Sequence, residues 1–182
     1  LNKYFEVLAY CPEHGKFAVI FNDVTERTKA EILIRESEAR LTRAEYVSDS
    51  GNWEYDMVKK VGRGSVGAKR VYGIDTELWT TEQIRAIQLP QYRDPLDKVF
   101  REFIENGKPY DVEFQIRNPK TGEIRDIHSI AEYDEKKQIV FGVVQDITAR
   151  TTAEEEINLY FDMSIDILCI VHFDGYYTRI NP

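Results

Sequence analysis

The stretch VVQDITARTTAE, at positions 143–154, changes within a few residues from an apolar, β-branched run to a charged run of helix formers. A second stretch, FNDVTERTKAE at 21–31, makes the same change. Each has an Asp, a β-branched apolar residue, a Thr, and an Arg four positions after the Asp. These residues are Asp23, Thr25 and Arg27 in one copy and Asp146, Thr148 and Arg150 in the other. A junction that recurs in this way indicates a module that repeats.

Each junction predicts a strand that ends where a helix begins. The Asp or Thr side chain is suited to accept hydrogen bonds from the free N–H groups of the first helical turn, where the helix dipole also favours an Asp. We expect Arg27 and Arg150 to reach back to Asp23 and Asp146. The cluster is read equally well as a structural cap worth about 1 kcal/mol and as a coupling between sheet and helix. All six residues are therefore signal-coupling candidates.

The region upstream of the second junction predicts an antiparallel meander. Val112, Phe114 and Ile116 alternate with polar residues, and 124–131 and 139–144 follow as two further strands. Turns are predicted at 118–122 and 134–137, and an earlier strand at 52–56.

Helices are predicted between the first strand and the meander. Glycines 62, 64 and 67 indicate a loop, which leads to a short helix over 67–73. A second short helix is capped by Thr80 or Thr81. The longest has Asp94 as its N-cap, Pro95 as its first residue and Gly107 after its end. The fold class is therefore α+β.

The flanking segments repeat parts of this pattern. Residues 3–22 predict a hairpin and 166–180 predict strand, Asp-Gly turn and strand. Apolar or small residues recur at heptad spacing in 25–48, as Ala30, Ile34, Ser37, Leu41 and Ala44. This stripe fits either a dimer seam or a helix that lies on its own domain.

The repeat divides the chain into five expected segments. They are 1–24, the last hairpin of a preceding module; 25–48, a linker helix; 49–148, a complete module; 149–163, a second linker helix; and 164–182, the first strands of a following module. The two partial modules are expected to pair with each other, within or between chains, because unpaired strand edges are exposed.

Composition excludes several classes of function. A net charge of −8 disfavours a nucleic-acid surface, and no apolar run reaches the roughly 20 residues of a membrane span. We therefore expect neither nucleic acid nor membrane contact. The only cysteines, Cys11 and Cys169, suggest no disulfide framework, so a reducing cytoplasm is the expected location.

Four motifs in order, GNWEYD (51–56), ENGKPYDVEFQIR (105–117), GEIRDIHS (122–129) and GVVQDIT (142–148), resemble a PAS domain of the PAS fold-3-like subfamily. That subfamily is common in bacterial and archaeal multi-PAS sensor proteins, often histidine kinases. The resemblance implies a five-stranded antiparallel sheet with helices on one face, here flanked by long amphipathic linker helices. It also implies a cavity for a small molecule or protein contact, and a signalling helix that leaves the last strand through the Asp-Ile/Val-Thr junction.

The expected function is a cytoplasmic sensory module that relays ligand or packing changes through these junctions and heptad helices to an output domain such as a histidine kinase. The alternatives are a ligand-free PAS module for dimerisation or spacing, and a regulator of a diguanylate cyclase or phosphodiesterase. Expected partners are a second copy, bound through linker helices and PAS surfaces, and neighbouring PAS and output domains. No catalytic residues are predicted, so the chain itself is not expected to be an enzyme.

A cavity is expected among the inward apolar residues of the complete module. The candidates are Trp53, Tyr55, Tyr72, Trp79, Phe100, Phe103, Phe114, Ile116, Ile127, Phe141 and Val143. Most belong to any core, and an unidentified small ligand is left open. Flavin is not expected, because 31–155 has no Cys, and haem is not expected, because the helix near 95–106 has no His. His14, His128 and His172 are too scattered for a metal site.

Overall fold

A computed structural model describes residues 3–182; residues 1 and 2 of the predicted first segment lie outside the described residues. The chain divides into two compact units, Leu1–Ala44 and Glu45–Pro182. Each unit is described by itself.

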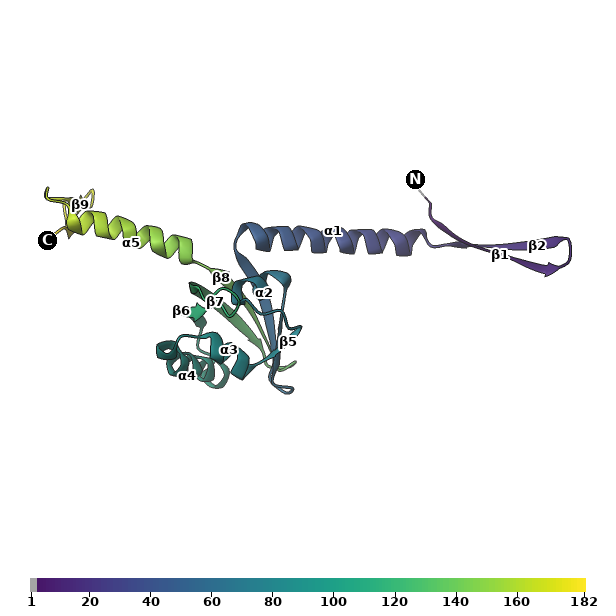
Figure 1. Ribbon diagram of the computed structural model, residues 1–182, viewed down its shortest axis with the longest axis horizontal. Coiled ribbons are helices and arrows are strands. Elements are labelled where there is room, and N and C mark those ends of the chain that lie inside the picture. The colour runs from purple at the N-terminus through teal and green to yellow at the C-terminus, as the bar shows by residue number, and fades with distance from the viewer. Residues whose placement is uncertain (1–2) are drawn as a thin grey trace. The chain divides into compact units, whose positions relative to one another are not determined.

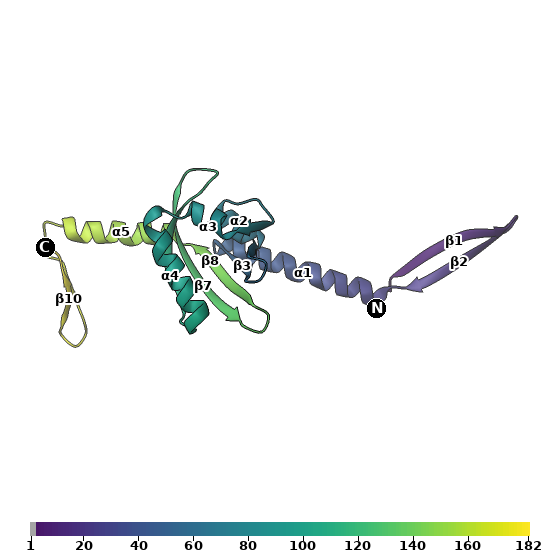
Figure 2. The same ribbon diagram turned by 90° about the horizontal axis from the view of Figure 1, so that it is seen from below.

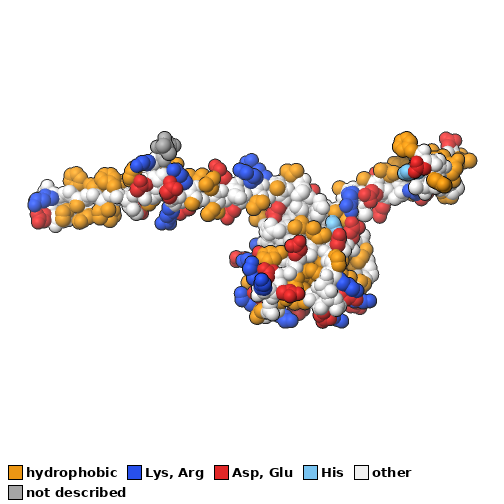
Figure 3. Space-filling view, turned by 180° about the vertical axis from the view of Figure 1, so that it is seen from behind, with side chains coloured by type: hydrophobic (Ala, Val, Ile, Leu, Met, Phe, Trp, Pro, Cys, Tyr) orange, Lys and Arg blue, Asp and Glu red, His pale blue; other side chains and the backbone are white. Residues whose placement is uncertain are grey.

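The first unit is a hairpin followed by most of a helix, as predicted; the last residues of this helix, from Glu45 on, belong to the second unit. Strands β1 (Phe5–Glu13) and β2 (Lys16–Asp23) pair antiparallel with Phe5 opposite Asp23, and α1 (Thr25–Val47) follows. Hydrophobic side chains gather along the hairpin, which appears orange in Figure 3. Phe17 and Phe21 are 79% and 67% exposed. The hairpin therefore has no covering layer of its own.

The second unit is built on one antiparallel sheet with the strand order β5-β4-β3-β8-β7-β6. Its strands are β3 (Ser50–Asp56), β4 (Val61–Gly64), β5 (Leu78–Thr80), β6 (Tyr110–Arg117), β7 (Ile124–Asp134) and β8 (Ile139–Asp146). The predicted count of five is therefore corrected to six. The additional strand is β5, in which Trp79 pairs with Gly62 of β4.

The loop predicted at Gly62 and Gly64 is wrong, because both glycines belong to strand β4. A Cβ at Gly62 or Gly64 would come within 2.1 or 2.2 Å of the Trp79 indole ring. The glycines thus leave room for a buried Trp on a paired strand, and their presence does not indicate a loop. Glycine in a strand often marks such a close approach.

Three helices cover one face of the sheet: α2 (Val66–Tyr72), α3 (Thr81–Ile87) and α4 (Pro90–Asn106). Figure 2 shows α3 and α4 on the same side of the sheet. Thr80 caps α3 as predicted, in a capping box with Gln83. Gly107 ends α4 in a left-handed conformation, also as predicted.

The predicted start of α4 at Asp94 and Pro95 is wrong. The helix begins at Pro90, after Leu89, and Pro95 lies inside it. Tertiary contacts explain the earlier start, because the Leu89 N–H donates to the Gln115 carbonyl oxygen at 3.0 Å. Asp94 instead contacts Arg85 of α3.

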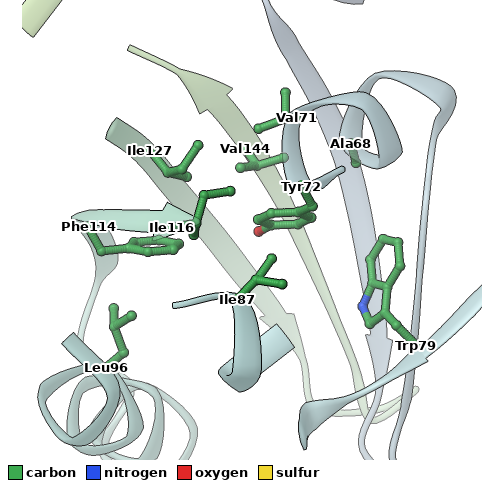
Figure 4. Packing of buried hydrophobic residues seen from close by; sticks show 10 residues of the cluster. All are labelled: Ala68, Val71, Tyr72, Trp79, Ile87, Leu96, Phe114, Ile116, Ile127 and Val144. Atoms are coloured by element: carbon green, nitrogen blue, oxygen red, sulfur yellow. The ribbon is translucent and has the colours of Figure 1, made fainter. Parts of the chain in front are cut away.

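The core lies between this sheet and the helices (Figure 4). Its buried hydrophobic residues are Ala68, Val71, Tyr72, Trp79, Ile87, Leu96, Phe114, Ile116, Ile127 and Val144. Alternate residues of β6, β7 and β8 supply the sheet side, which is the period-two pattern expected of strands with one covered face.

Helix α5 (Thr148–Met163) follows β8, and a short hairpin of β9 (Cys169–Val171) and β10 (Tyr177–Ile180) follows the helix (Figure 1). Within residues 3–182 of one chain, β1–β2 and β9–β10 form two separate two-stranded sheets. The pairing of the two hairpins with each other stays a prediction. No described helix is long and apolar enough to cross a membrane.

Candidate ligand cavity and exit junction

A cavity of about 180 Å³ lies between the sheet, α3 and α4. Its lining residues are Trp53, Tyr55, Tyr72, Trp79, Thr81, Ile84, Arg85, Gln88, Leu96, Asp97, Phe100, Tyr110 and Phe114. The aromatic rings meet edge-on, as Tyr55 does with Phe100 at 6.2 Å and Tyr72 with Trp79 at 6.0 Å. Such packing produces a rigid, mostly apolar wall.

The structure brings six of the eleven predicted residues to this cavity: Trp53, Tyr55, Tyr72, Trp79, Phe100 and Phe114. Phe103, Ile116 and Ile127 are buried in the domain but do not line the cavity. The prediction that Phe141 and Val143 face the cavity is wrong. Both side chains lie on the opposite face of the sheet, where they are 40% and 43% exposed.

The face of β8 is set by its neighbour β3. Gly142 pairs with Trp53, and a Cβ at Gly142 would come within 2.3 Å of the indole ring. Gly142 therefore faces inward beneath Trp53, together with Val140 and Val144, and the residues between them face outward.

The lining also includes polar residues that the sequence did not indicate. Among the described residues, Gln88 Oε1 and Trp53 Nε1 are the buried side-chain nitrogen and oxygen atoms without a hydrogen-bond partner. Both belong to side chains of the cavity wall. A buried polar group without a partner costs stability, so such a group in a cavity wall suits a polar atom of a ligand.

The partly exposed lining residues mark the mouth of the cavity between α3 and α4. Arg85 Nε lies 2.9 Å from Asp97 Oδ2, and Arg85 Nη2 lies 2.7 Å from Asp94 Oδ1. Tyr55 and Thr81 share a hydroxyl hydrogen bond of 2.8 Å. Helical periodicity places Asp97 beside Phe100, but no local pattern indicates that Arg85 bridges two helices.

Two tyrosines of the wall stay neutral at physiological pH. Burial raises the pKa of Tyr110 to about 12, and burial raises the pKa of Tyr72 further still. Burial disfavours the charged phenolate, which is the physical cause in both cases. Both hydroxyl groups can therefore donate a hydrogen bond, and that of Tyr72 lies beside Ser129.

The exit junction joins β7, β8 and the first turn of α5. Asp146 Oδ1 accepts from the Thr148 N–H at 3.1 Å and from the Thr148 hydroxyl at 2.5 Å. Thr148 Oγ1 in turn accepts from the Asp126 N–H at 2.9 Å, and the Ile147 N–H donates to the Asp126 carbonyl oxygen. The start of α5 is thus bonded to a central strand of the sheet.

The junction of the first unit has the same bonding pattern. The Thr25 N–H donates to Asp23 Oδ1 at 3.0 Å, and Thr25 Oγ1 accepts from the Tyr4 N–H at 2.9 Å. The Val24 N–H donates to the Tyr4 carbonyl oxygen. Hydrogen bonding to Thr25, first to its side chain and then to its backbone N–H, lowers the pKa of Asp23.

The arginines of the two junctions do not reach back as predicted. Arg27 pairs with Glu31, and Arg150 pairs with Glu113 and Glu154. A different residue, Arg125 of β7, lies 3.6 Å from Asp146. Sequence reasoning missed Arg125 because the contact crosses between neighbouring strands.

His128 faces outward from β7, where its Nε2 lies 2.7 Å from Asp111 Oδ1. Within residues 3–182, no group of three or more His, Cys, Asp or Glu side chains is arranged to hold a metal ion.

Comparison with known proteins agrees with this architecture. A family model described as PAS fold matches residues 64–144. A solved structure of a sensory box histidine kinase/response regulator from Burkholderia thailandensis E264 is 20% identical, with a TM-score of 0.53 over 66% of this chain and 93% of that chain. An RNA-binding light-oxygen-voltage receptor is 19% identical, with a TM-score of 0.51 over 61% of this chain and 31% of that chain. No curated protein matches the chain.

At these identities the solved structures support the fold alone, whereas the family model matches the sequence itself. The matched segment runs from Gly64, the last residue of β4, to Val144 in β8, and it contains β5, β6 and β7 in full. Strand β3 pairs with β4 and β8 in the same sheet. Residues 64–144 therefore match the PAS fold family, and the module between Ser50 and Asp146 that contains them has the PAS fold.

Proposed function

We propose that this PAS module is a sensory relay that passes changes in its cavity to α5, and through α5 to an output domain such as a histidine kinase. The observation that carries the proposal is the bond from the Asp126 N–H to Thr148 Oγ1. It links the first turn of α5 to β7, whose neighbour β6 supplies Tyr110 and Phe114 to the cavity wall.

The size of the cavity favours a ligand of one or two small rings. About 180 Å³ is smaller than the roughly 300–1,000 Å³ of pockets that hold drug-sized ligands. It is similar to the roughly 150 Å³ of an engineered apolar cavity that binds benzene. An apolar ring with one hydrogen-bond donor suits the aromatic wall and the unpaired Gln88 Oε1.

Indole, an apolar ring compound with one N–H, tests the relay. We expect indole to bind and to change amide hydrogen exchange at Thr148 and Thr151 in the first turn of α5. The Thr148→Val variant should bind indole within about twofold of the unaltered chain, because Thr148 lies outside the cavity, but should lose most of the exchange response. Isothermal titration and native-state exchange measure the two quantities.

The matched variants for this test are Ile84→Phe in the cavity wall and Leu78→Phe at an exposed position. We expect Ile84→Phe to weaken indole binding about tenfold or more, since overpacking costs about 1–3 kcal/mol, and Leu78→Phe to leave it unchanged. An equal exchange response in the unaltered chain and in Thr148→Val would contradict the relay.

We also infer that the two hairpins belong to neighbouring PAS modules. The register of Phe5 opposite Asp23 corresponds to that of Ile127 opposite Asp146. At the other end, Cys169 pairs with Ile180.

The Cys169 pair corresponds to Trp53 with Gly64. Asn181 repeats the bonding of Ser65, because its N–H donates to the Leu168 carbonyl oxygen and its side-chain oxygen accepts from the Leu168 N–H. These equivalences support a tandem array in which residues 1–24 and 164–182 extend the neighbouring sheets.

Cys11 and Cys169 are free thiols, which fits the proposed cytoplasmic location.

A second candidate function, dimerisation or spacing, is favoured by the outer face of the sheet. Ile130 pairs with Val143 there, and Phe141 lies on the same face. All three side chains are at least 40% exposed. A contiguous apolar group on an exposed sheet face is suited to a protein contact.

The dimer hypothesis predicts that Phe141→Glu shifts the chain from dimer to monomer, because the substitution buries a charge in the proposed interface. We expect the dimer dissociation constant to rise about a hundredfold, measured by sedimentation. Leu78→Glu, at an exposed position of β5, is the matched control and should leave it unchanged. A dimer of equal strength in Phe141→Glu would exclude this face as the interface.

A further inference from the structure

The short helix α2 is bonded at its first turn to the end of α1. Glu45 Oε2 accepts from the Gly67 N–H at 3.1 Å, and Glu45 Oε1 accepts from the Asn52 side chain at 2.8 Å. Ser65 caps the same turn by accepting from the Ala68 N–H. Two of the free N–H groups at the start of α2 are thus satisfied, one of them by a side chain from another helix.

Arg70 of α2 makes the return contact. Its Nη2 donates to the Glu45 carbonyl oxygen at 2.9 Å, and its guanidinium lies 4.8 Å from the centre of the Tyr46 ring. It also lies 3.4 Å from Asp49, just beyond the end of α1. A cation at the C-terminal end of a helix interacts favourably with the last carbonyl groups and the dipole.

The last turn of α2 is held from the exit side. Arg125 Nη1 donates to the carbonyl oxygens of Arg70 and Val71, at 3.2 and 3.1 Å. The same guanidinium lies 3.6 Å from Asp146, and both of these side chains are about one-fifth exposed. Asp146 also donates its N–H to the Asp49 carbonyl oxygen at 2.8 Å. The end of α1 and the start of α5 therefore meet at one end of the sheet.

We propose that Glu45 and Arg70 are positioning residues that couple the end of α1 to the exit junction through α2 and Arg125. The inference rests on the proposed relay into the first turn of α5, where Asp146 bonds Thr148, and adds to it a second input, the incoming helix. This route does not pass through the cavity. Tyr72, at the end of α2, lines the cavity, so ligand and incoming helix act on the same short helix.

Native-state amide exchange on the full chain tests the coupling. In Glu45→Ala and in Arg70→Ala we expect the amides of Ile147, Thr148 and Thr151 to exchange about tenfold faster, because a hydrogen bond to a charged group is lost at α2. Amides of β6, at the far edge of the sheet, should change less than twofold. Arg70→Lys, which keeps the charge but loses the planar fork, should show an intermediate effect.

A double-mutant cycle separates positioning from a general loss of stability. In an Asp146→Asn background, Arg70→Ala should no longer accelerate exchange at Thr148 and Thr151, because the contact between Arg125 and Asp146 is already weakened. Arg63→Ala, which removes an exposed ion pair with Glu54, is the matched control and should leave these amides unchanged.

The outcomes of these measurements decide the inference. Uniform acceleration in β6 and α5, or no acceleration in α5, would overturn it. Additive effects of Arg70→Ala and Asp146→Asn would also overturn it. If Asp146→Asn alone leaves amide exchange in α5 unchanged, the proposed relay itself fails. If Asp146→Asn changes this exchange but Glu45→Ala and Arg70→Ala do not, only the coupling to the incoming helix fails.

Discussion

Replacement of Trp79 by Ala is expected to lower the free energy of unfolding by about 3–5 kcal/mol, the usual range for removing a buried Trp. Trp79 is 4% exposed and packs edge-on against Tyr72. Its indole ring covers Gly62 and Gly64, which have no side chains to fill the space that would be left. Chemical denaturation monitored by the remaining Trp53 measures the change.

A second substitution shows whether the glycines of β4 exist to accommodate this ring. A Cβ at Gly62 would contact only atoms of Trp79 within 3.0 Å. We therefore expect Gly62→Ala to destabilise the unaltered chain but to stabilise Trp79→Ala, since Ala is favoured over Gly when its space is open. The same sign of effect in both backgrounds would contradict this packing.

Replacement of Gly51 by Ala is expected to destabilise the domain by about 3 kcal/mol or more, at the upper end for overpacked sites. A Cβ at Gly51 would lie 1.8 Å from the Ala68 backbone nitrogen and 2.4 Å from the Gly67 carbonyl carbon. Backbone atoms have no alternative rotamer, so α2 must move away from β3. Thermal and chemical denaturation measure the loss.

Gly122 is the matched control because its backbone conformation, and not a lack of space for a side chain, favours glycine. It has a φ of +78° and open space around the Cβ position, so Gly122→Ala should cost only about 1–2 kcal/mol of left-handed backbone strain. If Gly51→Ala costs no more than Gly122→Ala, the close contact between α2 and β3 is not required for stability.

Local patterns were sufficient for most elements. Alternation in 112–117 and the capping residues near Thr80 and Gly107 concern neighbours in the chain, and the structure confirms them. The repeated junction is likewise local, because Asp146 and Thr148 bond to each other across two positions. Such interactions are encoded within a few residues and can be read from one sequence.

The errors concern contacts between distant segments. The run from Ile139 to Val144 is almost wholly apolar, so alternation alone does not indicate which residues face inward; the contact between Trp53 and Gly142 decides it. Pro95 was predicted to start a helix that instead begins at Pro90, where Leu89 bonds to Gln115 of β6.

The sequence by itself determined the α+β architecture, the two strand-to-helix junctions and six residues of the cavity wall, because each depends on short-range periodicity or local hydrogen bonds. Only the tertiary structure decided the partner of Asp146, the space beneath Trp79, and the meeting of Glu45, Arg70 and Arg125 around α2. The physical reason is that these contacts join residues 15 to 55 positions apart, from Gly64 with Trp79 to Arg70 with Arg125. Their approach depends on how the sheet pairs and on which side chains are small enough to permit it.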